Sequence, residues 1–176
     1  MNDKFFLDTN IIVYSFDSSV PSKQGMAQKL IRKALSQQSG CISYQVIQEF
    51  LNVATRKFAI PLSFQHCEQY LHDVLQPLCE VYPCIELYSH ALQNAERWKY
   101  APYDSLIVTA AIQAGCRQLY SEDLQHGQVI DALTITNPFS YENPSTFVRM
   151  ELIAYRDLLS ARETHPTVLR RNDFGA

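Results

Sequence analysis

A chain of 176 residues that is 47% hydrophobic and 19% charged can form one compact core that buries roughly 70% of the unfolded surface. Its net charge of −3 argues against a strongly basic nucleic-acid binder, and its lack of an apolar run of about 18 residues argues against a membrane-spanning protein. The five scattered cysteines include no Cys-x-x-Cys pair, which argues against zinc or redox chemistry and favours free thiols in a soluble, cytoplasmic, unexported protein.

The first predicted elements are a strand over 4–7 and a helix that begins near Ile11. Between them stand Asp8, Thr9 and Asn10, polar residues that end the strand and cap the helix. This order places Asp8 at the carboxyl end of the strand.

The next helix is predicted over 26–35, where apolar residues recur at helical spacing. Lys29, Arg32 and Lys33 fall on its opposite, solvated face. Gly40 is expected to end this helix. The helix is therefore amphipathic, with a basic outer surface.

A short strand over 41–43 leads into a helix over 46–54. Glu49 lies on that helix, roughly 60° around the axis from Val46 and about 40° from Val53. It therefore borders the apolar stripe instead of pointing directly into water. A carboxylate in this position suggests a specific role.

The second half of the chain continues the alternation of strand and helix. Asp104 lies in the acidic first turn of one helix, and Asp123 follows a strand within Ser121-Glu122-Asp123. The elements predicted here are a helix over 63–78, a strand over 81–85, a helix over 89–98, a helix over 104–115, a strand over 116–120, a turn with helical character over 124–127 and a strand over 133–136.

Repeated strand-helix units predict an α/β fold, with a central parallel sheet flanked by helices on both faces. We expect residues 1–139 to form this domain. Residues 140–176 are predicted to be a C-terminal extension that contains a helix and a flexible tail.

Four acids are expected to converge at one end of the sheet. In open parallel sheets the functional crevice lies beyond the carboxyl ends of the strands, and Asp8 and Asp123 each follow a strand directly. Asp104 begins the helix that leads to the strand before Asp123, and Glu49 lies one turn into the helix after the second strand.

Crowded carboxylates repel one another unless a cation neutralises them. Mg²⁺ and Mn²⁺ are the natural partners, because these hard ions prefer oxygen ligands. Such a site suits phosphodiester hydrolysis, in which a cation lowers the pKa of a water molecule and neutralises charge on the phosphate. The spacing of the acids does not fix whether one ion binds or two.

Each acid also has a purely structural explanation. Asp8 fits an Asx turn, Asp104 fits a helix cap worth about 1 kcal/mol, Asp123 fits a turn and Glu49 fits a surface position. Together they favour a site, because caps and turns do not require an acid at every strand end that faces one crevice.

These residues resemble the PIN-domain nucleases, many of which are toxins of bacterial VapBC toxin-antitoxin pairs. The resemblance runs from residue 5 to about residue 139. The motifs that carry it are the hydrophobic strand with Asp8-Thr9-Asn10, Glu49 within Tyr-Gln-Val-Ile-Gln-Glu-Phe, Asp104 within Tyr-Asp-Ser-Leu-Ile-Val-Thr-Ala-Ala, and Ser121-Glu122-Asp123.

The resemblance implies a three-layer PIN-like fold and an endoribonuclease that depends on Mg²⁺ or Mn²⁺. It also implies a homodimer and an antitoxin partner. The implied metal ligands and catalytic residues are Asp8, Glu49, Asp104 and Asp123, with Asn10 and Ser121 as supporting polar groups.

The chain departs from the family pattern after Asp123. The family often carries a second acid soon after that position, whereas this chain has Leu124-Gln125-His126. A PIN-like module that binds RNA or protein without cutting is therefore the alternative function. A receiver or phosphatase domain would need an acid at the position of Asn10.

The basic residues have two interpretations. Lys29, Arg32, Lys33 and Arg56 form a solvated surface on charge alone, but beside a nuclease site they would follow the RNA backbone, where phosphate contacts give affinity without sequence preference.

Overall fold

The computed structural model describes residues 4–140, and a six-stranded sheet forms its centre. The strand order is β3-β2-β1-β4-β6-β5, and every neighbouring pair is parallel except β5 and β6, which are antiparallel. The strands are β1 (Phe5–Leu7), β2 (Gly40–Ser43), β3 (Cys79–Val81), β4 (Gln118–Tyr120), β5 (Val129–Ile130) and β6 (Leu133–Thr136).

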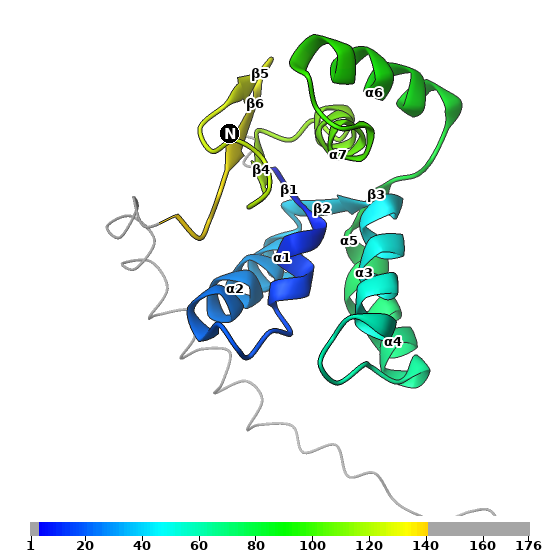
Figure 1. The fold of residues 1–176 in the computed structure, drawn as a ribbon, viewed down its shortest axis with the longest axis vertical. Coiled ribbons are helices and arrows are strands. Elements are labelled where there is room, and N and C mark those ends of the chain that lie inside the picture. The colour runs from blue at the N-terminus through cyan, green and yellow to red at the C-terminus, as the bar shows by residue number, and fades with distance from the viewer. Residues whose placement is uncertain (1–3, 141–176) are drawn as a thin grey trace, which may run out of the picture. The chain divides into compact units, whose positions relative to one another are not determined.

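Helices cover both faces of this sheet. The helices are α1 (Thr9–Tyr14), α2 (Pro21–Gln37), α3 (Tyr44–Arg56), α4 (Phe64–Tyr70), the π-helical turn η1 (Leu71–Leu75), α5 (Gln76–Leu78), α6 (Ile85–Trp98) and α7 (Pro102–Gln113). In Figure 1, α6 and α7 lie on one side of β1, β2 and β3, and α1 to α5 lie on the other. The predicted α/β fold with helices on both faces is therefore confirmed.

The core sits on both faces of the central strand. All three residues of β1, Phe5, Phe6 and Leu7, are buried, as expected of a strand inside a parallel sheet. Seven consecutive residues of α7, from Ser105 to Ala111, are buried as well, since this helix lies between the sheet and α6. Burial of this apolar surface is the main stabilising contribution to the fold.

The prediction that Gly40 ends a helix is wrong. Helix α2 ends at Gln37, and Gln38 adopts the left-handed conformation that follows it. Gly40 is the first residue of β2, where a Cβ atom would lie 2.3 Å from the Cβ of Ala34 and 2.8 Å from a ring carbon of Phe5. A glycine is needed there because α2 approaches the sheet too closely for a side chain.

Two further boundaries differ from the prediction. The strand expected over 81–85 is β3 at Cys79–Val81, and residue 85 already begins α6. Among the described strands, β3 is an edge strand that pairs only with β2, and Pro83 has no N–H with which to extend that pairing. The segment 124–127 contains bends and a turn but no helix. The two-residue strand β5, which follows it, is too short to leave a pattern in the sequence.

The extension predicted for residues 140–176 lies outside the described residues, apart from Ser140. Within the part of the chain that the structure describes, no helix combines the length and the hydrophobicity needed to cross a membrane.

Candidate functional site

A pocket of about 500 Å³ opens where the strand order reverses. Strands β2 and β3 lie on one side of β1, and β4 and β6 lie on the other, which is the arrangement that forms a crevice beyond the carboxyl ends of a parallel sheet. We call it the acidic pocket. It is lined by Asp8, Thr9, Asn10, Val13, Tyr14, Gln45, Glu49, Asn52, Val53, Lys57, Tyr103, Asp104, Ile107 and Asp123.

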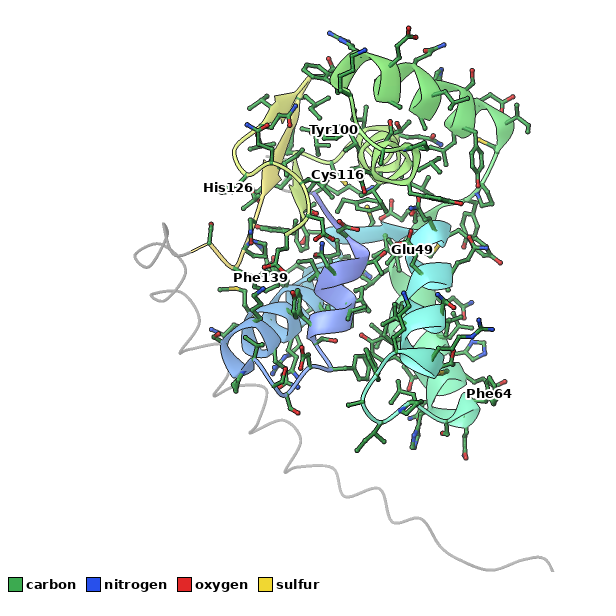
Figure 2. The ribbon with its side chains drawn as sticks, in the orientation of Figure 1. Glu49, Phe64, Tyr100, Cys116, His126 and Phe139 are labelled. Atoms are coloured by element: carbon green, nitrogen blue, oxygen red, sulfur yellow. The ribbon has the colours of Figure 1, made fainter. Side chains whose placement is uncertain are left out.

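All four predicted acids line the acidic pocket. Asp8 follows β1 and caps α1, Glu49 lies on α3 (Figure 2), Asp104 lies in the first turn of α7, and Asp123 lies in the loop after β4. Four separate segments of the chain therefore bring a carboxylate to one cavity. Their roles as metal ligands and catalytic groups stay a prediction.

The two predicted supporting residues lie between Asp8 and Asp123. The Ser121 hydroxyl donates to Asp8 Oδ2 at 2.6 Å, and the Asp123 amide donates to Ser121 Oγ at 3.2 Å. Asn10 Nδ2 lies 3.3 Å from Asp8 Oδ2 and 3.0 Å from Asp123 Oδ2. A serine and an asparagine thus connect the acids that follow β1 and β4.

Glu49 is held by two residues that the sequence interpretation missed. The Thr9 hydroxyl donates to Glu49 Oε2 at 2.5 Å, and Gln45 Nε2 donates to Glu49 Oε1 at 2.8 Å and to the Tyr103 carbonyl oxygen at 3.2 Å. Gln45 precedes Glu49 by one helical turn, a spacing at which side chains meet. That spacing could have identified Gln45 from the sequence. Thr9 could not have been identified in this way, because it is 40 residues from Glu49 along the chain.

The acids in the pocket destabilise one another's charged forms. Burial raises the pKa of Asp8 from its ordinary 3.8 to about 6, the hydrogen bonds from Ser121 and the Thr9 amide oppose this rise, and the charges of Asp123 and Glu49 add to it. Burial, followed by the charges of Asp123 and Glu49, also raises the pKa of Asp104. A positive charge in this pocket would relieve both effects.

The donor atoms of the pocket suit a hard divalent cation. The acids and Asn10 offer only oxygen ligands, which Mg²⁺ and Mn²⁺ prefer. Asn10 Oδ1 is buried and has no hydrogen-bond partner, so it is an acceptor available to an ion or its water. Within residues 4–140, no three Asp, Glu, His or Cys side chains lie close enough together to hold an ion. Coordination would therefore require the carboxylates to draw together around it.

An ion pair fixes the loop that carries Asp123. Lys23 of α2 forms a salt bridge with Glu122, and its Nζ atom lies 3.2 Å from the Tyr14 hydroxyl. Tyr14 itself lines the acidic pocket. Glu122, the neighbour of Asp123, is thus held against α2 by Lys23, which also contacts Tyr14 of α1.

None of the four predicted RNA-binding residues lines the acidic pocket. Lys29 and Arg32 are exposed on α2, and Lys33 Nζ lies 5.2 Å from the centre of the Phe5 ring. Arg56 lines a different cavity. Lys57, which was not among the predicted residues, does line the acidic pocket, and it follows the predicted Arg56 directly in the sequence.

The cavity beside Arg56 has about 400 Å³ and lies between α3 and α4. We call it the apolar hollow. In Figure 2, Glu49 lies near the strands, whereas Phe64 of the hollow lies at the far end of the helical layer. The hollow is lined by Leu51, Asn52, Thr55, Arg56, Phe64, Cys67, Glu68 and Leu71.

Comparison with known proteins gives one family and one fold. The family model described as PIN domain matches residues 5–131. A comparison with curated proteins finds no match by sequence.

Solved structures share the fold at low sequence identity. A toxin-antitoxin complex from Klebsiella pneumoniae aligns at a TM-score of 0.56 and 17% identity, over 78% of this chain and 99% of the other. DNA-bound VapBC from Salmonella typhimurium aligns at 0.54 and 19%, over 75% and 96%. VapC20 of Mycobacterium tuberculosis, described as a Sarcin-Ricin loop cleaving toxin, aligns at 0.51 and 14%, over 67% and 88%.

Proposed function

Because the chain belongs to the PIN domain family, we propose that it is a divalent-metal-dependent endoribonuclease that hydrolyses phosphodiester bonds in RNA. The observation that carries the proposal is the meeting of Asp8, Glu49, Asp104 and Asp123 in one pocket. The raised pKa of Asp8 and of Asp104 supports it, since buried acids with such shifts gather at functional sites.

The four carboxylates would hold Mg²⁺ or Mn²⁺, with Asn10 and Ser121 orienting Asp8 and Asp123. The bound cation supplies charge neutralisation at the phosphate and acidifies water for attack on phosphorus. Thr9 and Gln45 restrict the rotamers of Glu49 through the hydrogen bonds to its two oxygens. The chain thus contributes by fixing the orientation of the carboxylate oxygens that would bind the cation.

We further propose that the protein is the toxin of a toxin-antitoxin pair, that it forms a homodimer and that it acts in the cytoplasm. The solved toxin-antitoxin structures that share its fold support the toxin assignment. RNA is the proposed substrate because one of the proteins with this fold is described as cleaving the Sarcin-Ricin loop. Expression alone should arrest growth, and co-expression of the protein encoded beside it should restore growth.

The nuclease proposal is tested with the purified full chain and a structured RNA. We expect cleavage with Mg²⁺ or Mn²⁺, none with chelator, and none in Asp8→Asn. Glu68→Gln is the matched control, because Glu68 lines the apolar hollow instead of the acidic pocket. Unchanged cleavage by Asp8→Asn would reject the assignment.

A non-cleaving PIN-like module is the second candidate. Two observations favour it: Leu124-Gln125-His126 stands where a further acid is common, and no three acids of the described chain are within coordinating reach of one another. Binding of RNA that persists with chelator, without cleavage of any RNA tested, would support this candidate over the nuclease.

A further inference from the structure

The acidic pocket runs along the length of α3. Gln45, Glu49, Asn52, Val53 and Lys57 all line it, and their spacing of four, seven, eight and twelve residues from the first puts them on one helix face. At about 1.5 Å of rise per residue, the distance from Gln45 to Lys57 is roughly 18 Å. The pocket is therefore elongated, with Glu49 between its two ends.

An exposed aromatic ring marks the Gln45 end. Tyr103 lines the pocket and is 70% exposed, and its carbonyl oxygen accepts a hydrogen bond from Gln45. Tyr103 also immediately precedes Asp104. An exposed ring beside a polar pocket is a platform on which a nucleobase can stack, and such stacking tolerates any base.

A positive charge marks the other end. Among the described residues that line the acidic pocket, Lys57 is the one with a basic side chain. It is exposed at the carboxyl end of α3, where a cation is also favoured by the helix dipole. A lysine at this place suits a phosphate group of a strand that lies along α3.

We propose that the acidic pocket binds one unpaired RNA strand along α3, with a base stacked on Tyr103 and a phosphate bound by Lys57. The strand's backbone then passes the acids between these two contacts. The strand must be unpaired because the bases of a duplex already stack on each other. This inference rests on the proposed function for RNA as the substrate and adds the residues that position it.

Binding is measured in the full chain that carries Asp8→Asn, so that cleavage does not interfere. The probes are a short unpaired RNA with one 2-aminopurine and the same RNA in a duplex. Tyr103→Ala should weaken binding of the unpaired RNA by about tenfold and abolish quenching of 2-aminopurine. Tyr103→Phe and Tyr103→Trp should restore both. Tyr88→Ala is the control, because Tyr88 is exposed on α6 away from the pocket.

Lys57→Gln should weaken binding several-fold at low salt and reduce the slope of log affinity against log salt by about one. Lys99→Gln removes the same charge outside the pocket and should leave the slope unchanged. The proposal is overturned if Tyr103→Ala behaves as Tyr88→Ala does, if the duplex binds as tightly as the unpaired strand, or if neither RNA binds. If the binding results are as expected but the unmodified chain, with Asp8 in place, does not cleave RNA, the nuclease proposal is rejected instead.

Discussion

Helix α3 borders two cavities of similar size and different chemistry. The acidic pocket has about 500 Å³ and gathers four carboxylates, whereas the apolar hollow has about 400 Å³ and one carboxylate, Glu68; Asn52 of α3 lines both. Volume therefore does not distinguish them. What distinguishes them is that carboxylates are crowded together in the acidic pocket alone, where their mutual repulsion lowers the stability of the fold. The apolar hollow thus supplies matched controls for the acidic pocket.

The largest expected difference between the two cavities is in catalysis. Asp104→Asn should lower RNA cleavage at least 100-fold, because it removes a proposed metal ligand. Glu68→Gln makes the same chemical change in the apolar hollow and should leave cleavage within twofold. Rates are measured at saturating Mg²⁺ or Mn²⁺, and equal losses in both variants would remove the distinction between the cavities.

The second difference is in the pH dependence of stability without metal. The pKa of Asp8 is raised from 3.8 to about 6, so its stabilising contribution is fully present below pH 3.8 and is lost as pH rises through about 6. That loss amounts to about 3 kcal/mol in the free energy of unfolding. Urea denaturation in chelator should show this fall, and Asp8→Asn should reduce it. A fall of the same size in Asp8→Asn would contradict the prediction.

The third difference concerns stabilisation by metal. An ion that binds only the folded state adds about 2.7 kcal/mol at 100 times its Kd, which raises the Tm of a chain of this size by about 5 to 10 °C. Thermal unfolding with Mn²⁺ should show this rise in the unmodified chain and in Glu68→Gln. Glu49→Gln should reduce it, and an unchanged rise there would exclude Glu49 as a ligand.

The smallest expected difference comes from two threonines. The Thr9 hydroxyl donates to Glu49, whereas the Thr55 hydroxyl, beside the apolar hollow, donates to the Leu51 carbonyl of its own helix. Thr9→Val should lower cleavage about three- to tenfold, or about 0.7 to 1.4 kcal/mol. This is less than the roughly 1.5 to 3 kcal/mol of a hydrogen bond to a charged group, because Gln45 still holds the other oxygen of Glu49. Thr55→Val should leave cleavage unchanged. Comparable rates for the two valine variants would show that Glu49 needs no orienting group.

The sequence predicted the parts of the site that depend on chain order. Asp8 and Asp123 each follow a strand, and parallel strands end at the same edge, so their meeting follows from the alternation of strands and helices. Asp104 was found because the helix that it begins leads to the strand before Asp123, and Glu49 was found because it borders the apolar stripe of its helix. These inferences need only local pattern and topology.

The sequence did not predict the parts that depend on three-dimensional packing. Thr9 was hidden because its partner Glu49 is 40 residues away, and Lys57 was hidden because counting charges does not show which residue faces the pocket. Gly40 was misassigned for the same reason. A side chain at this position would clash with Ala34 of α2 and Phe5 of β1, and the sequence does not show that these residues lie so close. The sequence alone does not distinguish a glycine that ends a helix from one that allows two elements to pack closely.

The pairing of β1 with β4 has a consequence for translation. Asn10 and Asp123, whose side chains are in contact, are separated by 113 residues, and β4 is added to the sheet beside β1 only after most of the domain has been synthesised. A nascent chain on the ribosome therefore lacks the loop with Ser121 and Asp123 until this segment has left the exit tunnel. Under the proposed function, an unfinished polypeptide therefore has only three of the four carboxylates of the acidic pocket.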